Sequence, residues 1–424
     1  MLFERTQEQQ YIVGFDLGDD SCQISYLNYL AQPMKNEPKT FSTAAGEEKF
    51  DIPTVLYKSF GVNRWFCGEE AARMSSNKNG TFLPGLLSLA VDRSPVTIEN
   101  SAYDPVQLLS LFISRTLTVL NNTVPFKEIA AIMFTARDMS EDMIGVLESV
   151  RKRLSLECRI YYESYGASFY NYLLVQQKIL RDPAVFLAEM EKNGTLRFHK
   201  LQYNIHTRPI VAFETVKTFP ALKEAGPEGK DAELAALLAQ EIGNTPYASA
   251  FLVGHGFYGN WMRKSLAVLC RGRRAFLGNN LFSKGAVYGA LFKIAPPAIC
   301  GEYFFLDGNK LPYNIGIRAA QHGGISYHAI LDAGINWYEV NRDVDLILEE
   351  TNEIHLVLTP LRGGETRDFL IRLDGLPARS GRTARIRMHF RQPEPDSMQI
   401  RIEDLGFGAI FPSTGLKWEQ ELHL

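Results

Sequence analysis

The sequence has few cysteines, and their spacing excludes the sites that cysteines usually build. There are five, and no two of them form a C-x-x-C pair: Cys22, Cys67, Cys158, Cys270 and Cys300. Structural zinc sites and disulfide frameworks need cysteines at short, regular intervals. The pattern therefore argues against both and favours a reducing compartment.

The chain also lacks a long apolar run, an excess of charge and any short repeat. The uncharged run at residues 247–256 is far shorter than a membrane span, which needs about 20 residues. The net charge of -3 provides no attraction to nucleic acid or to an anionic membrane. Residues 1–10 are charged and polar, unlike a signal peptide. We therefore expect a cytoplasmic protein that binds neither nucleic acid nor membrane.

What the chain does have is the composition of a soluble globular protein, with 46% hydrophobic and 22% charged residues. Its 424 residues are too many for one ordinary core, which predicts two or three domains.

Helical and strand patterns are mixed up to about residue 297 and change after the pair Pro296-Pro297. Before this pair the periodicity predicts helices at residues 103–121, 138–154, 164–180, 231–242, 261–270 and 284–293. Strands are expected between them at 128–135, 158–162, 184–202 (a pair), 209–217 and 248–253. Beyond it short alternating segments predict strands at 327–331, 345–349, 353–358, 367–373, 383–390 and 397–402. We predict an α/β domain at 1–297 and an all-β sandwich or half-barrel at 298–424.

Four segments contain residues that could bind a ligand or take part in a reaction, and the first is a hairpin at residues 11–26. An apolar strand ends in Asp16, turns at Gly18 and continues through Ser21. The backbone N–H groups of such a turn can bind a phosphate. Asp19 and Asp20 at its tip would repel that anion, and a purely structural turn is the alternative.

The second and third segments each pair an acid with a turn. Glu163 links a strand to a helix, where it could cap the helix or face a metal-bound phosphate. Glu189 ends the next strand and is followed by a bend at Gly194-Thr195, which could equally be an ordinary hairpin.

The fourth segment is a strand that ends in Gly254-His255-Gly256 before a helix. Glycines at this place let a ligand approach the backbone closely, although tight packing of strand on helix needs them as well.

In this order the four segments resemble the nucleotide-binding domain of the actin-like ATPase superfamily, and most closely the DnaK-type heat-shock chaperones. Residues 50–55, 64–73 and 306–317 are similar to further stretches of these chaperones, so that the likeness covers nearly the whole chain. It implies an α/β, two-lobed, ribonuclease H-like domain followed by a β-sandwich that binds peptides.

The resemblance also implies a site for ATP or ADP with magnesium. Its nucleotide-binding residues would be Gly18, Ser21, Gly194, Thr195, Gly254 and Gly256. Its metal-binding residues would be Asp16, Glu163 and Glu189.

Several departures from the family bear on the reaction. Acids replace the hydroxyl residues of the first hairpin, and a carboxylate about 4 Å from a phosphate charge costs roughly 4 kcal/mol unless a cation bridges them. The family's catalytic lysine has no counterpart after residues 68–70, and the subdomain that grips adenine is largely missing between residues 196 and 252. No counterpart of the helical lid is found. We therefore expect at most a weak ATPase and assign no catalytic residue.

Two functions follow from the resemblance. The first is a chaperone-like protein, in which a degenerate ATP-binding domain controls how the β-sandwich binds an unfolded or extended peptide. The alternative is a pseudo-ATPase scaffold or interaction protein that no longer binds nucleotide. If exposed, Trp337, Tyr338 and Phe407 could anchor a specific protein partner, although aromatic residues in strands are more often part of the core. A filament-forming actin relative is disfavoured, because such proteins have no appended β-sandwich.

Overall fold

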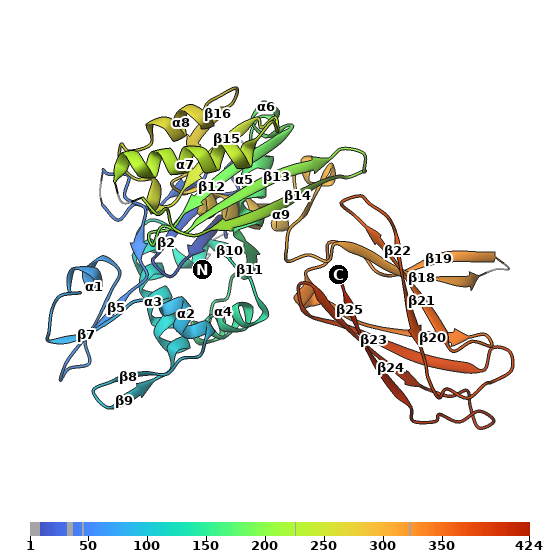
Figure 1. Ribbon diagram of the computed structural model, residues 1–424. Coiled ribbons are helices and arrows are strands. Elements are labelled where there is room, and N and C mark those ends of the chain that lie inside the picture. Colours follow the sequence, from blue (N-terminus) through green and yellow to red (C-terminus); the bar gives the residue numbers. More distant parts are fainter. Residues whose placement is uncertain (1–8, 32–36, 45, 225, 322–323) are drawn as a thin grey trace, which may run out of the picture. The chain divides into compact units, whose positions relative to one another are not determined.

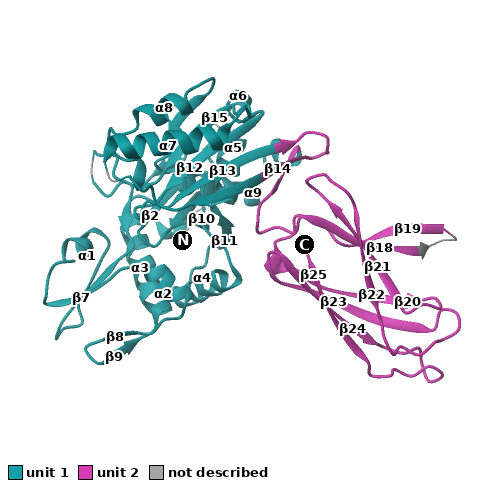
Figure 2. Ribbon diagram, viewed as in Figure 1, with its two compact units in different colours: residues 1–202, 214–301 teal, residues 203–213, 302–424 magenta. Residues whose placement is uncertain are grey.

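The computed structural model describes residues 9–31, 37–44, 46–224, 226–321 and 324–424, which form two compact units (Figures 1 and 2). Unit 1 comprises residues 1–202 and 214–301, and unit 2 comprises residues 203–213 and 302–424. The sequence pattern placed the boundary at 297/298, four residues before the division at 301/302. Residues 203–213 belong to unit 2 because strand β14 (Ile210–Phe219) pairs there with β17 (Tyr303–Leu306).

The first sheet of unit 1 is built around β1 (Tyr11–Leu17), which is buried on both faces along most of its length. The strand pairs antiparallel with β2 (Ser21–Asn28) and parallel with β10 (Ile129–Ala136). Beyond these lie β3 (Lys39–Thr40) and β11 (Arg159–Ser164), which gives the order β11-β10-β1-β2-β3.

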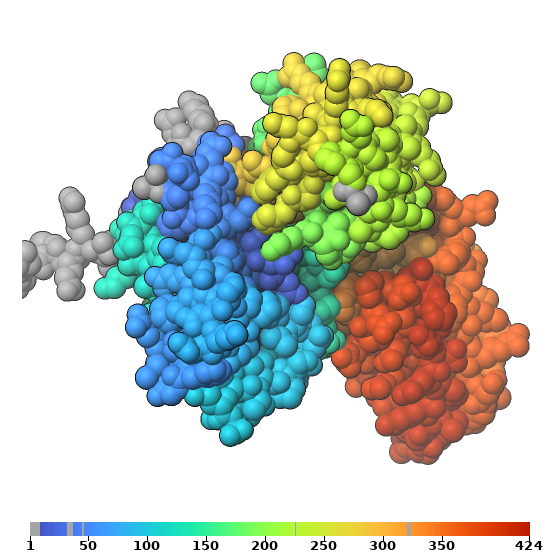
Figure 3. Space-filling model, turned by 60° about the vertical axis from the view of Figure 1, so that its left-hand side comes forward, coloured from blue at the N-terminus to red at the C-terminus, as the bar shows by residue number. Residues whose placement is uncertain are grey.

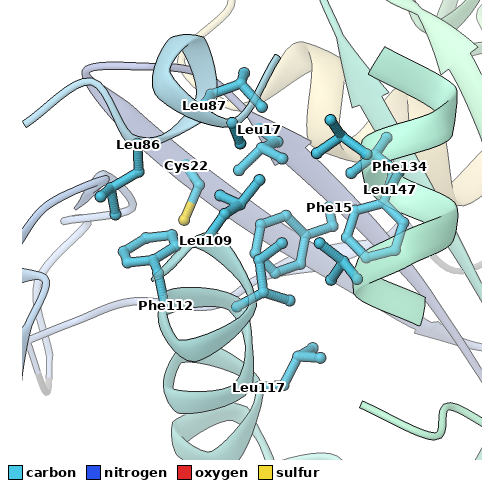
Figure 4. Close-up of a cluster of buried hydrophobic side chains, with 14 of the residues drawn as sticks. Phe15, Leu17, Cys22, Leu86, Leu87, Leu109, Phe112, Leu117, Phe134 and Leu147 are labelled. Atoms are coloured by element: carbon cyan, nitrogen blue, oxygen red, sulfur yellow. The ribbon is translucent and has the colours of Figure 1, made fainter. Parts of the chain in front are cut away.

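Helices α3 (Pro105–Leu120) and α4 (Glu141–Arg153) pack against each other and share one hydrophobic core with this sheet. Each begins where a side chain accepts a hydrogen bond from the first turn: Asp104 from the backbone N–H of Val106, and Ser140 from that of Met143. Figure 4 shows the cluster that they enclose, in which Phe15 of β1 lies close to Phe134 of β10, with ring centroids 5.3 Å apart.

The second sheet repeats the strand order of the first. Its first strand, β12 (Ala184–Met190), pairs antiparallel with β13 (Leu196–Asn204) and parallel with β15 (Ser249–Val253). The complete order is β16-β15-β12-β13-β14-β17, in which β15 pairs parallel with β16 (Arg274–Leu277). Helices α7 (Pro227–Ile242) and α8 (Arg263–Leu269) pack against each other beside it.

Helices α5 (Tyr165–Leu174) and α9 (Leu281–Ile294) pack closely against each other and α9 against the first sheet. A Cβ atom on Gly285 would lie 2.0 Å from the Ser168 carbonyl oxygen, and one on Gly14 would lie 2.2 Å from that of Ser283. Only glycine fits at these two contacts, of which the first brings α9 against α5 and the second brings α9 against β1.

The remaining elements of unit 1 are short. They are β4 (Ile52–Pro53), β5 (Leu56–Ser59), β6 (Trp65–Cys67), α1 (Glu69–Arg73), β7 (Gly80–Leu83), α2 (Leu86–Val91), β8 (Val96–Ile98), β9 (Ser101–Tyr103) and α6 (Lys178–Arg181).

The long elements predicted from periodicity are confirmed, with ends that differ by a few residues. The single helix predicted at 164–180 is wrong, because α5 ends at Leu174 and α6 is a separate turn. No helix in the described ranges is both long and apolar enough to cross a membrane.

Unit 2 contains two four-stranded sheets with the orders β19-β18-β21-β22 and β20-β23-β24-β25. Their inward side chains form one shared core, which includes Ile315 and Leu356 from the first sheet and Met388 and Ile400 from the second. The strands are β18 (Tyr313–Gln321), β19 (Gly324–Leu331), β20 (Asn341–Leu348), β21 (Glu353–Pro360), β22 (Arg367–Arg372), β23 (Ala384–Glu394), β24 (Ser397–Asp404) and β25 (Lys417–His423).

The expectation that Trp337 is an exposed anchor is wrong. Its side chain is 4% exposed, whereas Phe407 is 43% exposed and Tyr338 is half-buried. Trp337 lies in a short 3-10 turn that packs on β23, and its indole nitrogen donates to the Asn309 side chain.

Candidate functional site

A cavity of about 560 Å³ lies in unit 1 where the ends of β1 and β12 meet the start of α9. Its lining comes from the first turn (residues 16–23), the second turn (189–193), the segment after β15 (253–258) and residues 278–282. Figure 3 shows the blue-to-cyan N-terminal part of unit 1 beside its green-to-yellow C-terminal part. The volume falls in the range of small-molecule and cofactor sites.

The structure brings five of the nine predicted site residues to this cavity. Those in its lining are Asp16, Gly18, Ser21, Glu189 and Gly254. Those outside the lining are Glu163, Gly194, Thr195 and Gly256, although the neighbours Lys192 and Asn193 of the second turn do line it.

Asp16 is a half-buried carboxylate with no cationic partner in the described part of the chain. Its Oδ1 accepts a hydrogen bond of 2.6 Å from the Tyr165 hydroxyl. Burial raises the pKa of Asp16 to about 7, and the charge of Glu189 adds to this, while the Tyr165 hydrogen bond and Arg137 act in the opposite direction. The carboxyl group therefore titrates near neutral pH.

Glu189 occupies the same place in β12 but lies between cations. Its Oε1 accepts a hydrogen bond of 2.5 Å from Arg137, and its Oε2 is 3.5 Å from Nε2 of His199. Burial alone would raise the pKa of Glu189, but His199 and Arg137 outweigh it and lower the pKa to about 2. Glu189 is therefore ionised at every physiological pH.

His199 is the buried centre of this network. Its Nδ1 lies 2.8 Å from Oε1 of Glu214, on the side opposite Glu189. Burial would lower the pKa of His199, but the two glutamates raise it to about 9. A protonated imidazole thus sits between two carboxylates and offsets one of their two negative charges.

Arg137 forms the cationic wall of the cavity. It follows the fully buried strand β10 and pairs with Glu189 and, at 3.0 Å, with Glu191. Its guanidinium carbon lies 5.7 Å from the centre of the Tyr165 ring, which in turn stacks on Phe282 with centroids 4.0 Å apart. The carboxylates hold the guanidinium in one place, facing the cavity.

The acid at the tip of the first turn has a structural partner. Oδ1 of Asp19 accepts a hydrogen bond of 2.9 Å from the backbone N–H of Ser88, and its Oδ2 accepts one from the Ser88 hydroxyl. Ser88 lies in the first turn of α2, whose N-cap residue Gly85 has no side chain to offer. Asp19 thus caps α2 from 69 residues away in the sequence. This role explains why the turn carries a carboxylate, although a carboxylate would repel a phosphate.

Glu163 is turned away from the cavity, between α5 and α9. Its Oε1 accepts a hydrogen bond of 2.6 Å from Ser168, and its Oε2 accepts one of 2.9 Å from Asn171. Within the described residues no group of three or more His, Cys, Asp or Glu side chains could hold a metal ion. The three predicted metal ligands are therefore not brought together, although Asp16 and Glu189 share the cavity.

The two glycines after β15 face Met190 of β12, Gly254 its backbone and Gly256 its side chain. A Cβ atom on Gly254 would lie 2.3 Å from the Met190 carbonyl oxygen, and one on Gly256 would lie 2.2 Å from Cγ of Met190. Close packing against β12 accounts for both glycines. This is the structural alternative that the sequence left open.

Sequence reasoning missed Arg137, Tyr165, Asp51 and His255, which all line the cavity. Arg137 carried a signal, because polar residues at the carboxyl end of a buried parallel strand often face a ligand. The others have no local pattern that sets them apart from ordinary surface residues.

Comparisons with known proteins give two family matches. Residues 37–308 match a model described as the C-terminal part of a family of unknown function (DUF5716), and residues 310–424 match a domain of unknown function (DUF8552). Among curated proteins, none matches the chain.

Proposed function

We infer the function of this chain, which belongs to the family of unknown function DUF5716, from its own geometry. We propose that it is a chaperone-like protein that binds a magnesium nucleotide in the cavity of unit 1 with little or no hydrolysis. The nucleotide state would control how unit 2 binds an extended peptide. One observation carries the proposal: two turns from equivalent strands, β1 and β12, converge on one cavity of suitable size.

The repeated topology supports the resemblance to actin-like ATPases. In each sheet of unit 1 the first strand pairs antiparallel with the second and parallel with the fourth, which pairs parallel with the fifth. Two copies of a ribonuclease H-like sheet with phosphate-binding turns are the plan that the resemblance implies.

The charges around the cavity fit a magnesium nucleotide better than a free one. Six carboxylates line it: Asp16, Asp19, Asp20, Asp51, Glu189 and Glu191. Arg137 offsets the two glutamates, His255 lies 3.2 Å from Asp51, and Asp19 caps a helix. Magnesium binds through one or two carboxylates and the phosphates of its ligand. Asp16, with Glu189 beside it, is the carboxylate that would hold the ion or its waters.

The same residues argue against rapid hydrolysis. Phosphoryl transfer depends on cations placed to stabilise charge in the transition state. Among the described lining residues Lys192 is the single lysine, and it lies on the exposed second turn. Arg137 is engaged by two glutamates, so that little of its charge is left for a phosphate.

Unit 2 supports the peptide-binding part through one of its edge strands. Strand β19 contains no Asp, Glu, Lys or Arg, whereas the edge strands β20, β22 and β25 each carry several. Its Ile325 and Tyr327 side chains are 79% and 46% exposed. Charged residues protect sheet edges from pairing, and an uncharged edge accepts an added strand.

A second function is favoured by the same lining of acids. If six carboxylates exclude any nucleotide, unit 1 is a rigid pseudo-ATPase scaffold and the protein acts through its partners alone.

Thermal unfolding with nucleotide tests the two against each other. ATP or ADP at about 100 times its Kd, with magnesium or calcium, should add about 2.7 kcal/mol to the free energy of unfolding. This corresponds to a rise of roughly 4 °C in the Tm of a unit of this size. No rise at millimolar nucleotide with either metal would overturn the proposal and favour the scaffold.

A charge reversal on the second turn makes the test specific. Lys192→Glu should weaken the nucleotide-dependent rise, because Lys192 is exposed and lines the cavity. The matched control is Lys127→Glu, which is also exposed and lies outside the lining. An equal response of both variants would mean that the nucleotide binds elsewhere.

A further inference from the structure

A group of polar side chains joins the two sheet regions of unit 1 at the edge of the cavity. Asp51 lies just before β4, which pairs with the first sheet. Its Oδ2 is 3.2 Å from both Nε2 of His255 and the Tyr258 hydroxyl, which follow β15 of the second sheet. Gln23 completes the group by donating to Oδ1 of Asp51 at 2.8 Å and to the Asn279 carbonyl at 2.7 Å.

These side chains stand between two hollows. A second cavity, of about 620 Å³, adjoins the first and shares with it Gln23, Asp51, His255, Tyr258 and Asn279. The second cavity has a different character, because Phe50, Val55, Phe82 and Pro84 contribute an apolar wall. The contacts of Asp51 therefore divide one cleft into two chambers.

The bridge is a more exposed polar connection between the two sheets than the pairing of Arg137 with Glu189, whose side chain is buried. Away from the cavity, α5 and α9 meet at Gly285, where a side chain would overlap the Ser168 carbonyl, and such backbone contacts leave little room for movement. At the bridge the side chains are partly exposed, at 26% for Asp51 and 35% for His255. Polar contacts with this exposure are weak enough to open and close.

We propose that Asp51, His255 and Tyr258 form a gate that closes the cleft of unit 1 and controls the passage of a ligand between its two chambers. That the ligand is a nucleotide rests on the proposed function, whereas the gate itself rests on the contacts above.

The charges on the gate set the conditions under which it stays closed. The hydrogen bond to Asp51 raises the pKa of His255, against the effect of its burial. Burial would raise the pKa of Asp51, but the hydrogen bonds from His255, Gln23 and Tyr258 lower it. Both shifts extend the pH range in which a protonated His255 faces an ionised Asp51 and the two attract each other.

Raising the pH removes this attraction by deprotonating His255. The other titratable groups that act on the pair are Asp20 and Lys192, through His255, and Asp16 and Cys22, which feel the charge of Asp51. Tyr258 keeps its proton throughout this range, because burial and Asp51 raise its pKa to about 12. The gate should thus loosen between neutral and alkaline pH.

Hydrogen–deuterium exchange of the full chain without nucleotide tests the gate directly. In Asp51→Asn and in His255→Gln, amides at residues 252–258 should exchange at least threefold faster than in the wild type at pH 7. The control is Glu69→Gln, which breaks the ion pair of Glu69 with Lys49 on the wall of the second chamber. This pair lies within the first sheet region, so its loss should leave the exchange at 252–258 unchanged.

Two outcomes would overturn the gate. One is exchange in both gate variants equal to that in Glu69→Gln. The other is a wild-type protein whose exchange at 252–258, corrected for the intrinsic effect of pH, is the same at pH 7 and pH 9. Faster exchange at 252–258 in both gate variants, without any nucleotide-dependent rise in Tm, would support the gate and contradict the proposed function. The failure of the gate and the failure of the proposed function can therefore be told apart.

Discussion

Asp16 and Glu189 occupy the same position in two sheets of the same order, and their surroundings are opposite. Each is the sixth residue of a seven-residue first strand, and each strand ends at a turn that lines the cavity. Glu189 lies among Arg137 and His199, which lower its pKa to about 2. Asp16 has a tyrosine hydroxyl as its contact, and burial raises its pKa to about 7.

The difference shows that the charge of the cavity is balanced on one side only. The carboxylates of the second half are neutralised without any ligand, by His199 of β13 and by Arg137, which follows β10 of the first sheet. The first half has an uncompensated acid that gains from a cation brought in from outside. A magnesium nucleotide would supply that charge next to Asp16, and this asymmetry is the strongest physical argument for a ligand that contains a metal.

Removing the charge of Glu189 from the balanced half of the cavity should have the largest effect on the free energy of unfolding. In Glu189→Gln the protonated His199 and Arg137 lose their shared counter-charge in a buried place. Removing one partner of a buried ion pair costs about 3 to 5 kcal/mol. Urea unfolding should show this loss of stability.

The control for this variant is Glu228→Gln, at the exposed start of α7. It removes the same charge and should cost less than about 1 kcal/mol. Equal losses in the two variants would mean that the cations around Glu189 do not depend on it.

The sequence predicts those strands and site residues that depend on local patterns, and it does not predict contacts between residues far apart in the chain. Periodicity identified β1, β10 and β12 because each is a continuous apolar run whose pattern is local. The resemblance to the actin-like ATPases, rather than periodicity, implied Asp16 and Glu189 as site candidates. Periodicity missed the short strands β5 to β7 and β16, which have three or four residues and no measurable period.

The partners that decide the charge of each acid could not be predicted in this way. Arg137 and Glu189 are 52 residues apart, and Asp19 and Ser88 are 69 apart. Their pairing depends on how the sheets and helices pack, which no local pattern encodes. The same reason explains why Asp19 looked like a contradiction in the sequence and is a helix cap in the structure.

The uncompensated charge of Asp16 can be tested through the pH dependence of protein stability. The pKa of Asp16 is raised from 3.8 to about 7 on folding, so the folded state binds more protons between these values. The contribution of Asp16 to stability should therefore fall as the pH rises from about 4 to about 7 and stay constant above. Asp16→Asn cannot ionise and should lack this loss, so that it becomes more stable than the wild type at pH 8 by about 1 to 3 kcal/mol.

The measurement is the free energy of unfolding of both proteins between pH 4 and pH 8. Asp20→Asn, an exposed acid in the same turn, is the matched control and should follow the wild-type profile. A parallel profile for Asp16→Asn and the wild type would show that Asp16 is as well solvated as an ordinary surface acid, and the asymmetry with Glu189 would disappear.

The smallest expected effect concerns Asp19, at the tip of the same turn. Asp19→Ala removes the acceptor for the backbone N–H of Ser88 and should cost about 1 kcal/mol, with faster amide exchange in Leu86–Val91. Asp19→Asn keeps an acceptor oxygen and should lose less than half as much. If Asp19→Ala is as stable as the wild type, Asp19 is not needed as a cap. Its carboxylate would then count with Asp16 among the uncompensated charges, which would increase the difference between the two halves of the cavity.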